Sequence, residues 1–500
     1  MDYTPIISSS RWSHGNLTYS FLRSISSLAT TYPNYESIEE TFAPVAAAIQ
    51  TSLRSILNPG AGDPLRAAYF SDVSGLTFAE LLPPSGTVGD IAIGTFSQPG
   101  VPASAYYPST EGYGGDIWLD SSLTTPSPDG SHGHFVLVHE IGHSVGLEHG
   151  NVYPTDSTAV APHLAPQFDN MKYSVMSYNV DPDGQGRYPV GLQQFDIAAL
   201  QEMYGPNYGT RSDDTIYAFR SSPGILTIWD GAGKDRIDTT EISQTVVIDL
   251  QPGHFSSIGG TKNVAMALVS HLPLSDQFRP LIENARSGAG NDDLIGNDAV
   301  NILESGGGRN KLYGNKGDDV LVSDGSRDRL DGGAGNDALI NHQQDGNTEY
   351  VFARGYGHDG IRDNPFNTLG NIDVLLENLT PSEVKLIVHR IDVNPFVPLE
   401  ERTAEPQYKY GATFIEVSNT GDTLLLPWSY RTDDVFANPR FSSYYSYEED
   451  SIQFAGGQTW DMQNLESYVT FRDLTTLEEF EYPTQIYDWI TPDALQYMYS

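Results

Sequence analysis

The first 205 residues alternate between helical and strand-like patterns of apolar positions. Tyr35 to Leu57 carries apolar residues at helical spacing, and Phe135 to Leu147 is apolar between a few polar positions, as in a buried helix. Residues 195–203 predict another helix, which Tyr204-Gly205-Pro206 closes. Gly115 to Asp120 reads as a short strand. Residues 1–205 therefore predict a mixed α and β domain.

Beyond residue 206 the helical spacing disappears, and residues 287–340 form six units of nine residues. The eighth position of every unit is leucine: Leu294, Leu303, Leu312, Leu321, Leu330 and Leu339. The sixth position is always Asp or Asn: Asp292, Asn301, Asn310, Asp319, Asp328 and Asp337. Residues 346–500 are again strand-rich and aromatic. We therefore predict three domains, over residues 1–205, 206–345 and 346–500.

Charge and composition narrow the function. The chain has 65 acidic and 27 basic residues, a net charge of −38, which argues against a nucleic-acid partner because phosphates would be repelled. The excess of carboxylates serves either solubility or the binding of a hard cation such as Ca²⁺. Without cysteine, the chain has no disulfide, no thiolate metal site and no cysteine nucleophile.

The chain shows no sign of a membrane anchor. Residues 1–33 lack the basic start and apolar core of a secretory signal peptide, and no apolar run approaches the roughly 20 residues that span a bilayer. If the protein is exported, its export signal lies elsewhere in the chain or a leader has been removed.

The segment from His139 to His149 carries the candidate chemistry. His139 and His143 lie one helical turn apart, so both can bind one Zn²⁺, while Glu140 points at a metal-bound water. Gly146 can turn the chain so that His149 becomes the third ligand. Three protein ligands leave a position for water, which is typical of a catalytic zinc site.

This pattern resembles the metzincin metalloproteases, in which a methionine turn lies beneath the zinc. Ser174-Val175-Met176-Ser177-Tyr178 resembles that turn, with Met176 as its methionine. A tyrosine two residues after that methionine, here Tyr178, resembles the pattern of the serralysins. In that family the phenol of this tyrosine ligates zinc in the resting enzyme and hydrogen-bonds the transition state. Segments around Tyr107, Trp118 and Asp196 also resemble serralysins, so the resemblance covers about residues 10–340.

The resemblance implies an α+β chain, with a metzincin-like catalytic domain, a parallel β-roll of RTX repeats and a C-terminal acidic β domain. It implies one catalytic Zn²⁺ held by His139, His143, His149 and Tyr178, and catalysis by Glu140 and Tyr178. Strand 115–120 is expected to form the upper rim of the cleft and pair with an extended peptide. Partners would be protein or peptide substrates and a proteinaceous inhibitor, and the protein would be a secreted monomer, exported by a bacterial type I system.

The nine-residue units match the consensus of the calcium β-roll, G-G-x-G-x-D-x-U-x. Successive units alternate sides, so Ca²⁺ would sit between units two apart. One side carries Asp292, Asn310 and Asp328, and the other carries Asn301, Asp319 and Asp337. Only Asp319 and Asp337 join two good turns with two carboxylates, because the asparagines supply uncharged oxygens.

An earlier unit, Asp230 to Asp235, matches the same pattern. By its resemblance to serralysins, this segment implies another Ca²⁺ site, with the ligands Asp213, Asp230, Gly233, Asp235 and Glu283. A single Gly-Asp turn of this kind is more often an ordinary β-turn.

Two alternatives to a peptidase remain. One is an adhesin-like RTX calcium-binding protein with a retired protease domain, against which the intact Glu140 and three histidines speak. The other is an RTX lipase, for which no Gly-x-Ser-x-Gly motif exists. Residues 346–500 resemble a β domain that often follows RTX repeats. His132 and His134 are expected to lie in a loop or behind the ligands.

Overall fold

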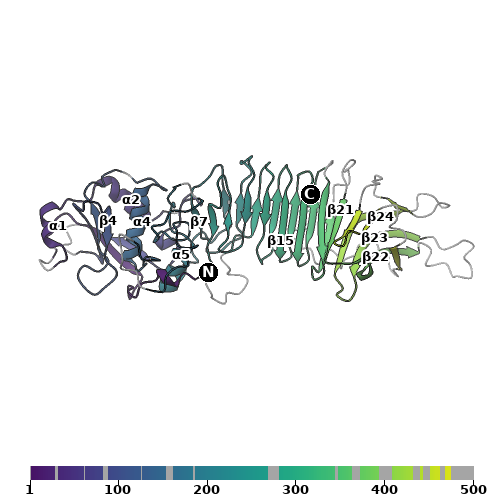
Figure 1. Ribbon diagram of the computed structural model, residues 1–500, viewed down its shortest axis with the longest axis horizontal. Helices are drawn as coiled ribbons and strands as arrows, with labels where there is room; N and C mark the ends of the chain where they lie inside the picture. The colour runs from purple at the N-terminus through teal and green to yellow at the C-terminus, as the bar shows by residue number, and fades with distance from the viewer. Residues whose placement is uncertain are drawn as a thin grey trace, which may run out of the picture. The chain divides into compact units, whose positions relative to one another are not determined.

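The computed structural model describes most of the chain (Figure 1). The description leaves out residues 1, 27, 29–31, 61, 83–87, 126, 154–160, 184–185, 269–280, 344–346, 363–371, 393–407, 432–439, 443–450, 462–467 and 474–500. The chain forms two compact units. The first comprises residues 1–217, 221–235 and 252–282, and the second comprises residues 218–220, 236–251 and 283–500.

A five-stranded sheet and five α-helices build most of the first unit. The sheet order is β2 (Thr77–Glu80), β1 (Asn16–Phe21), β3 (Ile91–Phe96), β5 (Ile117–Asp120) and β4 (Ala103–Ala105). All neighbours are parallel except β4 and β5. The helices are α1 (Tyr35–Thr41), α2 (Ala47–Leu57), α3 (Phe70–Val73), α4 (His132–Ser144) and α5 (Gln194–Tyr204), and the chain starts with a 3₁₀ turn, η1 (Thr4–Ile6).

A small sheet completes the first unit. It has the order β10 (Phe255–Ser256), β11 (Val264–Met266) and β7 (Leu226–Ile228). Strand β6 (Ile216–Ala218) lies where the first segment of this unit ends. Apolar side chains of α2, β3, α4 and α5 share one buried core, in which Leu53, Ile93, Ile141 and Phe195 are fully buried. The core therefore fixes α4, the helix that carries the two histidines.

Two predictions for the first unit were wrong in detail. The helix expected over residues 35–57 is split into α1 and α2, because Ala43 pairs with Thr95 and Pro44 cannot continue a helix. The strand expected at the rim of the cleft, β5, lies between β3 and β4, so the free edge of the sheet on this side belongs to β4.

The second unit consists of long, mostly parallel ladders, whose rungs are visible around β15 and β21 in Figure 1. One sheet has the order β27 (Thr459–Asp461), β26 (Ser451–Phe454), β21 (Ile372–Glu377), β19 (Thr348–Ala353), β17 (Arg329–Ala334), β15 (Lys311–Lys316), β13 (Asp293–Ile295) and β9 (Val247–Asp249).

The other sheet contains the alternate turns of the roll. Its order runs through β28 (Val469–Asp473), β22 (Val384–Asp392), β23 (Tyr408–Val417), β24 (Thr423–Arg431), β20 (His358–Arg362), β18 (Ala338–Asn341), β16 (Val320–Ser323), β14 (Ile302–Ser305), β12 (Asn284–Arg286), β8 (Arg236–Asp238) and β6 (Ile216–Ala218). Strand β25 (Arg440–Ser442) pairs with β24, and the turn η3 (Pro381–Glu383) precedes β22.

The nine-residue period sets the register of both sheets. Leu294 pairs with Leu312 and Leu312 with Leu330 in one sheet, while Leu303, Leu321 and Leu339 pair in the other. All six leucines are fully buried. The predicted alternation of successive units between two sides is therefore confirmed.

The ladders continue beyond the last predicted repeat. Leu330 pairs with Tyr350, and Leu339 pairs with Ile361, so β19 and β20 extend the same two sheets. Among the described residues, no new sheet begins at residue 346. The structure is mostly β with few helices, and the division into three domains stays a prediction.

Candidate metal centres

Helix α4 presents His139 and His143 on one face. Ser131 caps the helix, since its side chain accepts a hydrogen bond from the backbone N–H of His134. Both histidines are buried. The helix ends at Ser144, and Gly146 then turns the chain with a φ of +102°, where a Cβ would lie 2.5 Å from the carbonyl oxygen of Ser10. This turn needs glycine, and it carries the chain on to His149.

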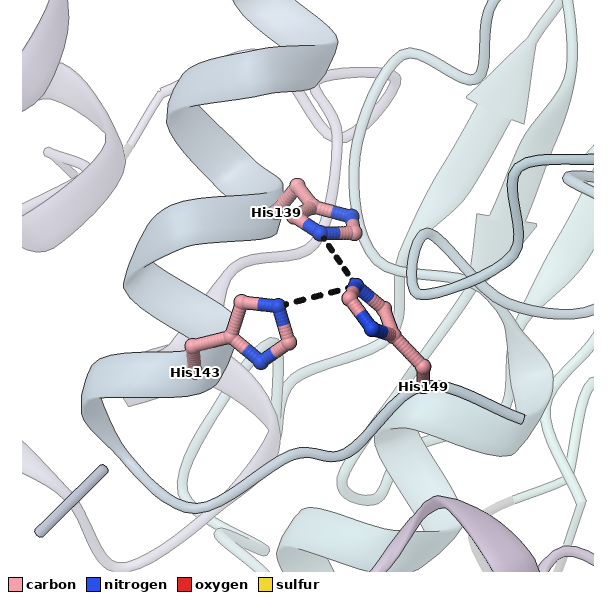
Figure 2. A group of neighbouring side chains, drawn as sticks. All are labelled: His139, His143 and His149. Carbon is pink, nitrogen blue, oxygen red and sulfur yellow. Dashed lines mark hydrogen bonds between the residues drawn. The ribbon is translucent and has the colours of Figure 1, made fainter. Parts of the chain in front are cut away.

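The three imidazoles converge through their Nε2 atoms, as Figure 2 shows. Nε2 of His149 lies 3.1 Å from Nε2 of His139 and 3.1 Å from Nε2 of His143. One nitrogen from each ring lies within 4.8 Å of the others. Across the described part of the chain, this is the one cluster of His, Cys, Asp or Glu that meets such a criterion.

Backbone carbonyls determine which ring nitrogen carries the proton. Nδ1 of His139 lies 2.8 Å from the Val175 carbonyl oxygen, and Nδ1 of His143 lies 2.9 Å from that of Leu147. A carbonyl oxygen only accepts, so each Nδ1 is the donor and each neutral ring has its lone pair on Nε2. Two lone pairs directed at the same third nitrogen fit a shared cation, which is the usual arrangement of metal-binding histidines.

Glu140 lies on helix α4 beside His139, and Met176 packs against the same helix. Met176 is fully buried, and a Cβ on Gly142 would lie 2.8 Å from its sulfur, so the methionine packs directly against α4. Glu140 is also buried, and burial raises the pKa of its carboxyl to about 8. A nearby cation would lower that pKa and favour the ionised base.

Tyr178 lies beside the imidazoles and is 40% exposed. Its ring centroid is 4.8 Å from that of His149 and 5.4 Å from that of His139. On its other side it stacks on Tyr153 at 4.8 Å. The Tyr153 hydroxyl donates to Asp169 at 2.5 Å, and Asp169 also accepts from Ser177 at 2.8 Å. The phenol of Tyr178 is therefore exposed to solvent and adjacent to the cluster.

His132 and His134 lie apart from the cluster. Both belong to the first turn of α4, so the loop is wrong as their expected place, and the alternative, a position behind the ligands, stays a prediction. His134 is buried, with Nε2 3.0 Å from the Tyr69 hydroxyl and 3.1 Å from the Val190 carbonyl oxygen.

In the second unit, the sixth-position side chains form two columns. In one column the backbone N–H of Asn301 donates to Asp319 Oδ1 at 2.7 Å, and that of Asp319 donates to Asp337 Oδ1 at 2.8 Å. In the other, the N–H of Asp292 donates to Asn310 at 2.9 Å, and that of Asn310 donates to Asp328 at 2.6 Å. Each of these side-chain oxygens thus accepts a hydrogen bond from the backbone N–H of the residue 18 positions earlier.

The four aspartates of the columns differ in whether a donor reaches their second oxygen. Oδ2 of Asp319 and of Asp337 is buried, and within the described residues no hydrogen-bond donor reaches either atom. Oδ2 of Asp292 is also buried without a donor among the described residues, whereas Oδ2 of Asp328 accepts a hydrogen bond from the Ser323 hydroxyl. Burial, together with the Asp337 charge, raises the pKa of Asp319 to about 9, and burial raises that of Asp337 to about 7.

Of the five residues predicted to bind the earlier Ca²⁺, four belong to the first compact unit and one to the second, and their joint site stays a prediction. Asp213, Asp230, Gly233 and Asp235 belong to the first unit, while Glu283 belongs to the second. Asp230 is buried and accepts from the Tyr217 hydroxyl at 2.6 Å, and burial raises its pKa to about 6. Gly233 has a φ of +130°, and Asp235 Oδ1 accepts from the Thr215 N–H at 2.8 Å.

Comparison with known proteins gives consistent matches. The family described as Peptidase M10 serralysin C terminal matches residues 201–364. Metallopeptidase AprA of Pseudomonas marginalis is 34% identical over 318 residues, which cover 58% of this chain and 61% of that protein. Serralysin B of Dickeya chrysanthemi is 33% identical over 308 residues, covering 56% of this chain and 58% of that protein. Serralysin of Proteus mirabilis is 33% identical over 271 residues, covering 47% and 53% respectively.

This chain is a relative of the serralysins. It spans up to 61% of the length of these curated relatives. Among the described residues of this serralysin relative, no helix is long and apolar enough to cross a membrane.

Sequence reasoning missed several residues that hold the histidine cluster in place. Asp196 is fully buried and accepts from the Ser174 hydroxyl at 2.6 Å and from the Val175 N–H at 2.8 Å. The same peptide segment contacts His139 through the Val175 carbonyl. Tyr107 packs its ring against His143 at 5.2 Å and donates to Glu148 at 2.5 Å. Asp196 and Tyr107 lie in segments that resemble serralysins, but nothing in the sequence indicates the contacts that they make.

Proposed function

We propose that this serralysin relative is a secreted, zinc-dependent endopeptidase that cleaves proteins outside the cell. The observation that carries the proposal is the convergence of three Nε2 atoms, two of which belong to rings whose Nδ1 donates to a backbone carbonyl. Residues 1–205 would be the metzincin-like catalytic domain. The name of one relative, metallopeptidase AprA, supports the same proposal.

The proposed zinc ligands are His139, His143 and His149, with Tyr178 as a further ligand at rest. The donor set fits Zn²⁺, because neutral imidazole is a preferred ligand of this ion and three histidines leave room for water. A Zn²⁺ bound there would polarise the scissile carbonyl and lower the pKa of a water molecule.

The chain's own residues would move the protons. Glu140 would accept a proton from the attacking water and return it to the leaving amine. The buried position of Glu140 strengthens its interaction with that proton. The Tyr178 phenol would donate a hydrogen bond to the oxyanion of the tetrahedral carbon, and its exposed position supports this role.

The substrate would bind as an extended strand along β4. Strand β4 is the edge of the sheet next to β5, and it lies against α4. An exposed edge offers unpaired N–H and C=O groups to a peptide. The proposed partners are therefore protein or peptide substrates, and a protein inhibitor could use the same edge.

For the second unit we propose structural Ca²⁺ between the turns of the roll. In the roll, the proposed ligands are Asp292, Asn310, Asp319, Asp328 and Asp337. For the earlier repeat at residues 230–235, the proposed ligands are Asp213, Asp230, Gly233, Asp235 and Glu283. The unmet oxygens of Asp319 and Asp337 support this, because Ca²⁺ is bound by carboxylate and backbone oxygens.

Casein hydrolysis with metal analysis tests the peptidase proposal. Purified protein should contain one zinc per chain, and a transition-metal chelator should abolish hydrolysis until Zn²⁺ is restored. Zinc-loaded, folded protein without hydrolysis would favour the alternative, an adhesin-like calcium-binding protein with a retired protease domain.

A further inference from the structure

One buried carboxylate, that of Asp169, binds the residues on both sides of Tyr178. Its Oδ1 accepts from the Ser177 hydroxyl at 2.8 Å, and its Oδ2 accepts from the Asn179 side-chain amide at 2.8 Å. The Asn179 backbone N–H donates in turn to the Ser177 hydroxyl at 3.1 Å. The chain before and after Tyr178 is therefore tied to Asp169, which restrains the backbone from which the phenol extends.

The same carboxylate also holds the segment that follows the third histidine. The Tyr153 hydroxyl donates to Oδ1 of Asp169 at 2.5 Å, and Nδ2 of Asn151 donates to Oδ2 at 3.1 Å. The Tyr153 ring lies edge-on to the ring of His149, with centroids 5.8 Å apart. Burying a carboxylate is unfavourable unless hydrogen bonds compensate, and side-chain donors from two segments do so here. Asp169 thus joins the segment after His149 to the segment that carries Tyr178.

Tyr153 restrains the ring of Tyr178 as well. The two rings stack with centroids 4.8 Å apart and an interplanar angle of 28°. Tyr178 is exposed, and an exposed side chain changes rotamer rapidly when nothing packs against it. Tyr153 is buried, and its hydroxyl is bound to Asp169, so it offers Tyr178 a fixed surface for stacking. Backbone and ring are therefore restrained by one network.

We propose that Tyr153 and Asp169 are positioning residues that hold the Tyr178 phenol beside the imidazole cluster. The inference rests on the proposed peptidase function and on the role that it gives to Tyr178. Neither residue would touch the substrate, and both would act through Tyr178. A donor to a developing oxyanion is effective when it is held in place before the reaction. A loosened phenol should therefore lower kcat and leave KM nearly unchanged.

The competing explanation is that the network only stabilises the fold of these two segments. A double-mutant cycle on the full-length, zinc-loaded protein separates the two explanations. Asp169→Asn should lower kcat by about tenfold, less than the loss of the phenol itself. In the Tyr178→Phe background the same substitution should leave kcat unchanged, because the group that Asp169 positions is absent. Equal losses in both backgrounds would overturn the proposal.

A milder variant and a matched control complete the cycle. Tyr153→Phe keeps the stacked ring and removes only the hydroxyl that binds Asp169, so it tests the network even if Asp169→Asn does not fold. It should show the same dependence on Tyr178 with a smaller loss. The control is Tyr173→Phe, which removes a hydroxyl from a ring that packs on Phe195 and Phe255 and should leave kcat at the wild-type value.

Copper-loaded protein gives a readout that does not depend on turnover. Imidazole also binds Cu²⁺, and a phenolate bound to Cu²⁺ gives a charge-transfer band in visible light. Tyr178→Phe should abolish this band, Asp169→Asn and Tyr153→Phe should weaken it, and Tyr173→Phe should retain it. If even the wild type lacks the band, Tyr178 is no resting ligand and the kinetic cycle decides alone.

Two further outcomes distinguish this inference from the proposed function. Wild-type kcat in both Asp169→Asn and Tyr153→Phe would overturn the inference and leave the peptidase proposal intact. A folded wild type that binds no zinc and hydrolyses no casein would refute the peptidase proposal, and the inference with it.

Discussion

The histidine cluster and the carboxylate columns differ in how the protein itself satisfies their candidate metal ligands. Backbone carbonyls orient two of the three histidine rings, so contacts within the protein direct their Nε2 atoms toward His149. The column of Asp319 and Asp337 instead stacks acids whose second oxygens no described donor reaches. Ionising both would cost folding free energy unless cations neutralise them. Under the two metal proposals, zinc would bind a site whose ligands protein contacts already orient, while calcium binding would be part of the folding reaction.

Calcium removal should produce the largest effect and tests the comparison directly. In a calcium-selective chelator, we expect the roll to lose most of its β structure in circular dichroism, since its binding energy is folding energy. A transition-metal chelator used with Ca²⁺ present should abolish hydrolysis and leave the spectrum unchanged. A complete β spectrum in the calcium-free protein would contradict the distinction.

Substitution of Glu140 by alanine should remove chemistry without removing structure. Loss of a general base lowers kcat by about 10²–10⁴-fold. The zinc content and the melting temperature should stay near those of the wild type, because the three histidines remain. Glu202→Ala removes an exposed carboxylate from α5 and serves as the control. Substantial turnover by Glu140→Ala would disprove its role as the base.

Tyr178→Phe should have a smaller effect on the same site. Removing one donor to a developing oxyanion lowers kcat by on the order of 10², while KM changes little because the bond forms in the transition state. The stacked ring on Tyr153 is retained in this variant. An unchanged kcat would mean that the phenol is only a resting ligand or a packing group.

Within the roll, Asp319 and Asp337 should matter more than the asparagines. Replacing both aspartates by alanine should raise the calcium concentration at the folding midpoint more than replacing Asn301 and Asn310 by alanine. The aspartates supply two charges between well-formed turns, whereas each asparagine supplies an uncharged oxygen. Titrating both double variants with Ca²⁺ by circular dichroism measures the difference, and equal midpoints would show that the carboxylate pair is not special.

A pH effect should be the smallest and is confined to the calcium-free protein. Burial raises the pKa of Asp319 to about 9 and that of Asp337 to about 7, above the usual 3.8. The folded state then holds protons that the unfolded state releases, so stability is greatest below about pH 4 and falls as pH rises toward 9. Urea unfolding of the roll in chelator at several pH values checks the sign, and stability that rises over this range would contradict it.

The sequence predicted what repetition and close spacing determine. Six leucines at one position of a nine-residue period predicted the alternating ladders, because a parallel roll repeats its register. The pair His139 and His143 predicted a shared helical face for the same kind of reason. Both predictions depend on residues that are neighbours in a regular pattern.

Other features depend on contacts that no local pattern records. Asp359 accepts a hydrogen bond from the Asp337 N–H and continues the column, but it escaped notice because it follows after 22 residues instead of 18, although the strand register is restored. The place of β5 inside the sheet follows from the pairing of β4, a strand of only three residues. The helix break near Pro44 could have been predicted from the proline itself.

The link from Asp196 through Val175 to His139 makes the reactive centre a late event in the life of the chain. His139 is synthesised 57 residues before Asp196, yet its ring is oriented by a peptide that Asp196 holds from helix α5. A nascent or truncated chain that lacks α5 would carry all three histidines but not the carboxylate that holds the Val175 peptide against His139. The proposed peptidase would therefore become competent only after synthesis has passed α5.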